Sequence, residues 1–212
     1  MNSMPLGTWH FVLGEHQANS YLVFDEVTRE ALILDPGDEK KKLMKAIHDK
    51  GLRPIGIVLT HCHVDHIGAA AALRNKYACP VYAHKKEFEG LSNPEINFFG
   101  ERDLSLVPEI SLLGGEMIPF GGYALEVMHT PGHTPGGICL KVSGEPVVFT
   151  GDTVFMDDVG RTDLNGGSES QLKTSLRHIL ATWQDDWVLY PGHDGSGLMK
   201  EARPFLEKIA GK

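Results

Sequence analysis

The fold of this chain is decided by residues 54–66, which read PIGIVLTHCHVDH. The apolar residues from Ile55 to Leu59 predict a buried strand, because a short continuous apolar run suits a strand that is covered on both faces. The Ala-rich stretch 67–77 that follows predicts a helix. The segment HCHVDH, residues 61–66, therefore lies on a strand-to-helix turn, where functional side chains often occur.

Three imidazoles and one carboxylate within this segment indicate a metal site. If the extended path continues through residue 63, His61 and His63 point to one side and Cys62 points to the other. Asp65 and His66, where the chain turns into the helix, can then face a second point nearby. The alternative is a polar turn in which Asp65 caps the helix, but a cap needs only one acceptor.

Three later apolar runs also end in small residues followed by a candidate ligand. These candidates are His133 in PGHTPGG, Asp152 in GDTVF and His193 in PGH. A glycine lets the backbone approach a crowded centre closely. Each motif alone suits an ordinary turn at the end of a strand, but together with residues 61–66 they favour a metal centre.

Five histidines and two aspartates are too many for one ion, because zinc takes about four ligands and keeps one position open when catalytic. We therefore predict two divalent metal ions, with Zn²⁺ as the first choice and iron as the alternative. The economical partition is His61, His63 and His133 on one ion, Asp65, His66 and His193 on the other, and Asp152 bridging both. A hydroxide derived from water would be the second bridge.

The order of these motifs resembles the metallo-β-lactamase superfamily, and more narrowly its glyoxalase II-like (hydroxyacylglutathione hydrolase-like) hydrolases. HxHxDH, PGHTPGG, GDTVF and PGH match the family's ligand positions from about residue 10 to residue 193, and GRTD at residues 160–163 matches a further signature. The resemblance implies an α/β (α+β) fold, a four-layer αβ/βα sandwich, in a single domain over residues 1–212. It also implies hydrolysis of a thioester or related ester.

Two departures from relatives narrow the activity. The β-lactamases of the group usually replace His66 and lack Asp152 in this form, so lactamase activity is not expected. No glutathione-binding pattern follows His193, which leaves the thioester specificity open. Persulfide dioxygenases are the alternative, because they share HCHxDH and GRTD and would hold one iron on His61, His133 and Asp152.

In the hydrolytic mechanism, Asp65 is the candidate catalytic residue, since it could both ligate a metal and orient the hydroxide. Arg161 either meets a substrate carboxylate or forms an ion pair with Asp163, and the role of Tyr190 is equally open. Cys62 is expected to face away from the metals as an inert filler.

Composition is typical of a soluble enzyme. The formal charge of −8 disfavours a nucleic-acid partner, and no run approaches the about 20 apolar residues of a membrane span. Three cysteines without paired spacing and the lack of a signal-like N-terminus predict a cytoplasmic protein with reduced thiols. The predicted partner is a small-molecule substrate, and the oligomeric state is left open.

Apolar periodicity predicts alternating strands and helices. Strands are expected near 8–14, 18–26, 30–35, 54–60, 80–84, 115–119, 123–130, 137–143, 146–150 and 186–191. Helices are expected near 39–50, 67–77, 169–183 and 198–209. Residues 94–108 interrupt the pattern and are predicted to form a flap over the site.

Overall fold

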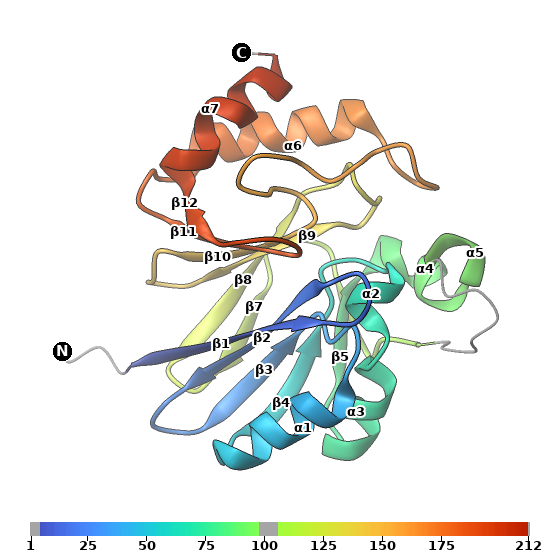
Figure 1. The fold of residues 1–212 in the computed structure, drawn as a ribbon, viewed down its shortest axis with the longest axis vertical. Helices are drawn as coiled ribbons and strands as arrows, with labels where there is room; N and C mark the ends of the chain where they lie inside the picture. The colour runs from blue at the N-terminus through green and yellow to red at the C-terminus, as the bar shows by residue number, and fades with distance from the viewer. Residues whose placement is uncertain (1–4, 98–105, 212) are drawn as a thin grey trace.

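Two six-stranded sheets face each other in the computed structural model, which describes residues 5–97 and 106–211 (Figure 1). The first sheet has the order β1 (Leu6–Leu13), β2 (Ala18–Asp25), β3 (Glu30–Leu34), β4 (Arg53–Val58), β5 (Val81–His84) and β6 (Ile110–Leu112). The second has the order β12 (Gly197–Leu198), β11 (Val188–Pro191), β10 (Val147–Gly151), β9 (Ile138–Val142), β8 (Tyr123–His129) and β7 (Met117–Phe120).

Helices cover the outer face of each sheet, so the molecule has four layers (Figure 1). The first sheet carries α1 (Lys40–Asp49) and α3 (Ala70–Tyr77), and the second carries α6 (Glu169–Thr182) and α7 (Met199–Ala210). The shorter helices are α2 (Val64–Ile67), the 3₁₀ turn η1 (Lys85–Glu87), α4 (Phe88–Ser92) and α5 (Pro94–Asn97). The predicted αβ/βα sandwich is confirmed.

The alternation of side chains along β2 explains why this strand is buried along its whole length. Leu22 and Phe24 pack into the core beneath the helices of the first half, whereas Tyr21 and Val23 pack between the two sheets. Successive residues of a strand point to opposite faces, so a strand covered on both sides must be apolar on both. Complete burial of a side chain such as Leu22 contributes about 1.5–3 kcal/mol.

The helix α6 packs on the second sheet as its sequence predicts. The Ser168 hydroxyl accepts a hydrogen bond from the backbone N–H of Gln171 at 3.4 Å, which satisfies one of the free donors at the helix start. Leu172, Leu176 and Ile179 are buried against the sheet. Both the amphipathic pattern of α6 and its N-terminal cap are therefore as the sequence predicts.

Several elements differ from those predicted. The helix expected at 67–77 is split into α2 and α3, because Gly68 and Ala69 turn against the loop at Pro36 and Gly37, where a Cβ on Gly68 would overlap the Gly37 carbonyl. The strands β6 and β12, of three and two residues, and the short helices η1, α4 and α5 were not predicted, because the strands are too short to show alternation and the helices are shorter than two helical turns. Of the predicted flap, residues 98–105 lie outside the described residues.

The carboxyl ends of several strands meet at one edge of the sandwich. β3, β4 and β5 are parallel neighbours in the first sheet, and β10 and β11 are parallel in the second. The backbone N–H of Ile138 donates to the Thr60 carbonyl at 3.1 Å, which joins the two sheets at this edge. Ligand sites of α/β folds commonly lie beyond such strand ends. Among the described residues, no helix is long and apolar enough to cross a membrane.

Candidate metal centre

All seven predicted side chains meet at this edge, carried by loops that follow β4, β8, β10 and β11. Three groups of potential ligand atoms each lie within 4.8 Å of one another, and one of them, Asp35, His61 and His66, shares a histidine with each of the other two. We call His61, His63 and His133 the three-histidine group, and Asp65, His66 and His193 the mixed group. They coincide with the two predicted ligand sets, and the assignment of ligands within them is our proposal.

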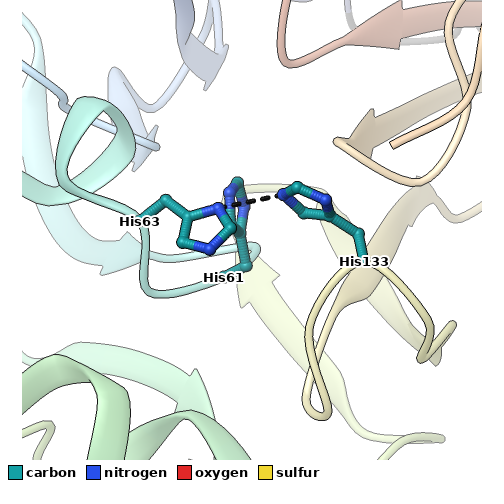
Figure 2. Close-up of side chains that lie close together, drawn as sticks. All are labelled: His61, His63 and His133. Carbon is teal, nitrogen blue, oxygen red and sulfur yellow. Dashed lines mark hydrogen bonds between the residues drawn. The ribbon is translucent and has the colours of Figure 1, made fainter. Parts of the chain in front are cut away.

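The three-histidine group joins the two halves of the molecule. Figure 2 shows His61 and His63 on one loop pointing toward His133 on another. The Nδ1 of His63 lies 2.9 Å from Nε2 of His133, and the other ring nitrogen of His133 donates to the Arg161 carbonyl at 2.7 Å. That second bond places the His133 proton on Nδ1, so the lone pair of Nε2 points into the group.

Electrostatics keep His61 and His63 neutral. Burial, together with neighbouring histidines, lowers the pKa of His63 to about 4 and holds the pKa of His61 well below its usual value. A neutral imidazole has a free lone pair at physiological pH, and this lone pair is what binds a metal ion. His61 and His63 can therefore donate ring-nitrogen lone pairs to a metal ion at physiological pH.

The mixed group is richer in negative charge. Nε2 of His193 lies 3.2 Å and Nε2 of His66 3.6 Å from the same oxygen of Asp65. Burial alone would lower the pKa of His66, but Asp152 and then Asp35 raise it to about 10. Burial opposes ionisation of Asp65, yet the bond from His193 and the charge of His66 hold its pKa below the usual range. A site that stabilises a proton this strongly also attracts a metal cation.

Asp152 lies between the two groups. Its Oδ1 is 3.4 Å from Nε2 of His66, and its Oδ2 is 3.6 Å from Nε2 of His133 and 3.9 Å from Nε2 of His61. Oδ2 is also 3.5 Å from Nε2 of His193. One carboxylate thus faces nitrogens of both groups, which is the placement that a bridging ligand needs.

Two buried atoms test whether a cation fits. Among the described residues, Nε2 of His61 and Oδ1 of Asp152 are buried and form no hydrogen bond. A buried polar atom without a hydrogen-bond partner costs free energy. Metal ions bound by these nitrogen and oxygen donors would remove both costs, and the donor set is one that zinc and iron accept. The residues therefore fit the predicted ions.

Asp35 is a site residue that the sequence analysis missed. It is buried, and its Oδ2 accepts from Nδ1 of His66 at 3.1 Å, while its two oxygens accept from the backbone N–H and the hydroxyl of Thr60 at 2.7 and 2.6 Å. Nε2 of His66 is thereby left to face Asp65 and Asp152. The signal was present, because Asp35-Pro36-Gly37 also follows a buried strand.

The loop that carries His193 is held by side chains of β2, which were also missed. The Asn19 amide donates to the carbonyls of Pro191 and Asp194, each at 2.9 Å, and the Tyr21 hydroxyl donates to the Pro191 carbonyl at 2.7 Å. These bonds span more than 160 residues of sequence. Contacts of this range leave no local pattern that could have revealed them.

Glycines before two ligands allow the close approach that we predicted. A Cβ on Gly192 would overlap Asp152 Oδ1, and Gly151 adopts a φ of 49° with Thr60 against it. The GRTD segment also packs on the centre, since a Cβ on Gly160 would overlap the Asp152 carbonyl and meet His133. Close packing of backbone thus explains this motif without any role for the Arg161 side chain.

The other side chains named in the sequence analysis, those of Arg161, Cys62 and Tyr190, form structural contacts. The Arg161 guanidinium forms a bidentate ion pair with Asp163 at 2.7 and 2.8 Å on the exposed surface. Cys62 is buried, and the Cβ of a residue at Gly90 would overlap its sulfur. Burial and the nearby Glu87 carboxylate raise the pKa of the Cys62 thiol, which keeps it protonated and unreactive. Tyr190 stacks on Phe149.

The chain belongs to the metallo-β-lactamase superfamily, whose sequence profile matches residues 13–193. It is 37% identical to the probable metallo-hydrolase YqgX of Bacillus subtilis, over 85% of this chain and 87% of that protein. It is 33% identical to the hydroxyacylglutathione hydrolase GloC of Haemophilus influenzae, over 90% of this chain and 93% of that protein. The superfamily inferred from the motifs is confirmed, and the second relative supports the narrower resemblance.

Three solved structures share the fold. The BLEG-1 B3 metallo-β-lactamase has a TM-score of 0.88 at 32% identity, covering 94% of this chain and 99% of that one. TTHA1623 in a di-iron-bound form has a TM-score of 0.81 at 32% identity, covering 94% of this chain and 96% of that one. ETHE1 from Myxococcus xanthus has a TM-score of 0.80 at 28% identity, covering 97% of this chain and 85% of that one. One of these proteins is named as a β-lactamase, so β-lactam cleavage must be among the activities tested.

Proposed function

We propose that this chain is a metal-dependent hydrolase that cleaves a thioester or a related ester, with a hydroxide held between two divalent cations. The observation that carries this proposal is the position of Asp152, whose Oδ1 faces His66 and whose Oδ2 faces His61, His133 and His193, so that it reaches both groups. A carboxylate shared by two complete donor groups supports a binuclear centre. The GloC relative supports a thioester as the substrate class.

The three-histidine group would hold one ion and the mixed group the other, with Asp152 bridging. A pair of divalent ions, when bound, lowers the pKa of a shared water to about neutrality and polarises the substrate carbonyl. We favour Zn²⁺, since imidazole and carboxylate together suit it. Iron is the alternative, and a di-iron form of the relative TTHA1623 supports keeping it open.

Asp65 is the proposed catalytic residue. Its side chain is 18% exposed and that of His193 25% exposed, whereas the side chains of His61 and His66 are at most 2% exposed. Substrate would therefore approach on the side of Asp65 and His193. Because the Asp65 pKa lies below its usual range, the carboxylate stays ionised and can orient the attacking hydroxide by accepting a hydrogen bond from it.

Two further parts of the proposal concern partners and location. The formal charge of −8 supports a small-molecule substrate over a nucleic acid. The three cysteines Cys62, Cys79 and Cys139 are unpaired and buried, and reduced thiols are the usual state in a reducing compartment. This supports our expectation of a cytoplasmic location.

A second candidate function is that of a mononuclear iron persulfide dioxygenase. It is favoured by the likeness to ETHE1 and by the position of Asp152 Oδ2, which faces both His61 and His133. Two histidines and one carboxylate form the facial set that non-haem iron oxygenases use. In that case His63 and the mixed group would stand outside the metal ligands.

Elemental analysis of protein purified without added metal, combined with three assays, tests these functions. The substrates are a hydroxyacyl-glutathione thioester, followed by thiol release, a glutathione persulfide, followed by oxygen uptake, and a chromogenic cephalosporin. We expect about two divalent ions per chain and thioester hydrolysis. One iron with oxygen uptake would replace the proposal by the dioxygenase, and cleavage of the cephalosporin alone would replace it by a lactamase.

A further inference from the structure

A buried carboxylate outside both ligand groups joins the two loops that make the three-histidine group. Glu87, at the end of η1, is 1% exposed. Its Oε2 accepts from the backbone N–H of Cys62 at 2.8 Å, and its Oε1 accepts from the backbone N–H of Gly136 at 2.6 Å. Cys62 lies between two of the histidines, and Gly136 lies in the loop of the third.

Both hydrogen bonds are charge-assisted, and they are the kind that a buried carboxylate requires. Within residues 5–97 and 106–211, Glu87 forms no ion pair with a lysine, arginine or histidine. A buried charge is tolerated only when hydrogen bonds compensate its lost hydration. The two amide donors fill that role, so the carboxylate and the two loops depend on one another.

Glu87 packs closely against the loop that carries Gly136, and on another side it lines a cavity together with Cys62 and Glu89. A Cβ on Gly136 would lie 2.7 Å from Glu87 Oε1 and 2.8 Å from His84 Nδ1, so this loop has no room for a larger residue. On the other side, His129 donates from Nε2 to the Pro135 carbonyl at 3.0 Å and stacks on His84 with ring centroids 4.1 Å apart. The segment Pro135-Gly136 is thus held by hydrogen bonds to both Glu87 and His129.

We propose that Glu87 is a positioning residue for the metal ion of the three-histidine group. This role rests on the proposed metal centre. His61 and His63 come from the first half of the chain and His133 from the second, so their spacing depends on how the two loops are held together (Figure 2). Glu87 holds the loops beside the proposed ligands, and its hydrogen bonds go to Cys62 and Gly136, which flank the three-histidine group.

The substitution Glu87→Gln tests the proposal, with Glu89→Gln as the matched control. Glutamine keeps the size of the side chain but turns an NH₂ donor toward one of the two backbone N–H groups. Glu89 is an exposed carboxylate two residues away on α4. Zinc affinities are measured by competition with a chromophoric chelator, and the Co²⁺-loaded proteins are compared by visible absorption.

We expect Glu87→Gln to bind one of the two zinc ions about 10–100-fold more weakly and to keep the other affinity, with an altered Co²⁺ spectrum. Glu89→Gln should match the wild-type chain in both measurements. Equal zinc affinities in wild type and Glu87→Gln, with only the melting temperature of the metal-free protein lowered, would overturn the proposal and leave Glu87 a purely structural residue.

A second variant covers the case in which Glu87→Gln does not fold. Glu87→Asp keeps the charge and shortens the side chain by one methylene, so it should fold and show an intermediate loss of affinity for the same ion. Wild-type affinity in a folded Glu87→Asp chain would count against positioning. Because the readout is metal affinity, the two proposals fail differently: a wild-type chain that binds no metal refutes the proposed function as well.

Discussion

Replacing Asp35 by Asn should weaken the binding of the metal ion in the mixed group, although Asp35 is not one of the proposed ligands. Asp35 lies behind His66 and accepts three hydrogen bonds, one from Nδ1 of His66 and two from Thr60. Asparagine has nearly the same shape, so the packing around residue 35 is preserved. The change is one of hydrogen-bonding capacity and charge.

The size of the expected loss in metal affinity follows from the tautomer of His66. The asparagine NH₂ would face the N–H at Nδ1 of His66, and relief of this clash moves the proton to Nε2. That nitrogen lies 3.4 Å from Asp152 and 3.6 Å from Asp65, at the place where the ion would bind. Partners that orient a ligating histidine are worth 10–100-fold in metal affinity, or about 1.4–2.7 kcal/mol.

Zinc titration against a competing chelator measures this loss, with Asp38→Asn as the control. Asp38 is an exposed neighbour whose carboxylate accepts from the backbone N–H of Glu39 and lies outside both ligand groups. Thermal unfolding of the metal-free proteins shows whether the fold is kept. Two zinc affinities within about twofold of wild type in a folded Asp35→Asn chain would refute the reasoning.

Four further predictions concern single residues. Asp152→Ala should abolish hydrolysis and reduce bound metal with little loss of fold, and full retention of both ions in elemental analysis would contradict the bridging role. Asp65→Ala should lower kcat by about 10²–10⁴-fold, and unchanged turnover would remove Asp65 from the mechanism. Arg161→Ala should reduce kcat/KM little and equally for anionic and neutral thioesters, because its guanidinium is already paired with Asp163; a loss confined to anionic thioesters would restore the anchoring role. Burial and then His129 lower the pKa of His84 from 6.5 to about 4, so the unfolded chain takes up this proton first and stability falls as the pH drops through that range. His84→Gln should flatten the pH dependence of stability between about pH 6.5 and pH 4 in urea unfolding, and identical slopes for the two chains would show that His84 does not carry it.

The gathering of the seven candidate side chains was predictable because the fold places them in a regular way. Side chains that follow parallel strands meet at one edge of a sheet, and each of the later ligands follows an apolar run that ends in small residues. His61 and His63 share a side because residues two apart in an extended chain do so. Simple rules of chain geometry thus predicted which histidines would gather.

The supporting residues were not predictable by the same rules. Asp35 contacts Thr60 and His66, and Glu87 contacts Cys62 and Gly136, over separations of 25 to 49 residues. A carboxylate that accepts backbone N–H groups has no required spacing, since almost any residue can donate. Only the three-dimensional path of the loops shows which carboxylates are buried beside the site.

The same limit explains the missed short elements. β6 and β12 exist because a neighbouring strand supplies their hydrogen bonds, β5 for the first and β11 for the second. Stretches of two or three residues carry no alternation that could be distinguished from a loop. Pairing with a partner strand, and not local preference, determines such strands.

The distribution of charge explains why this site belongs at the meeting edge of the two sheets. Asp35, Asp65 and Asp152 gather three carboxylates around imidazoles, and burial there lowers the pKa of His61 while the carboxylates raise that of His66. Such opposite shifts a few ångströms apart mean that one end of the centre offers neutral donors and the other a negative field. Divalent cations satisfy both ends at once, since they take lone pairs from the first and neutralise the second. The rigid sandwich, the hydrogen bond that Asn19 donates and those that Glu87 accepts hold these groups close despite their mutual repulsion, and a preorganised set of donors binds a metal ion tightly.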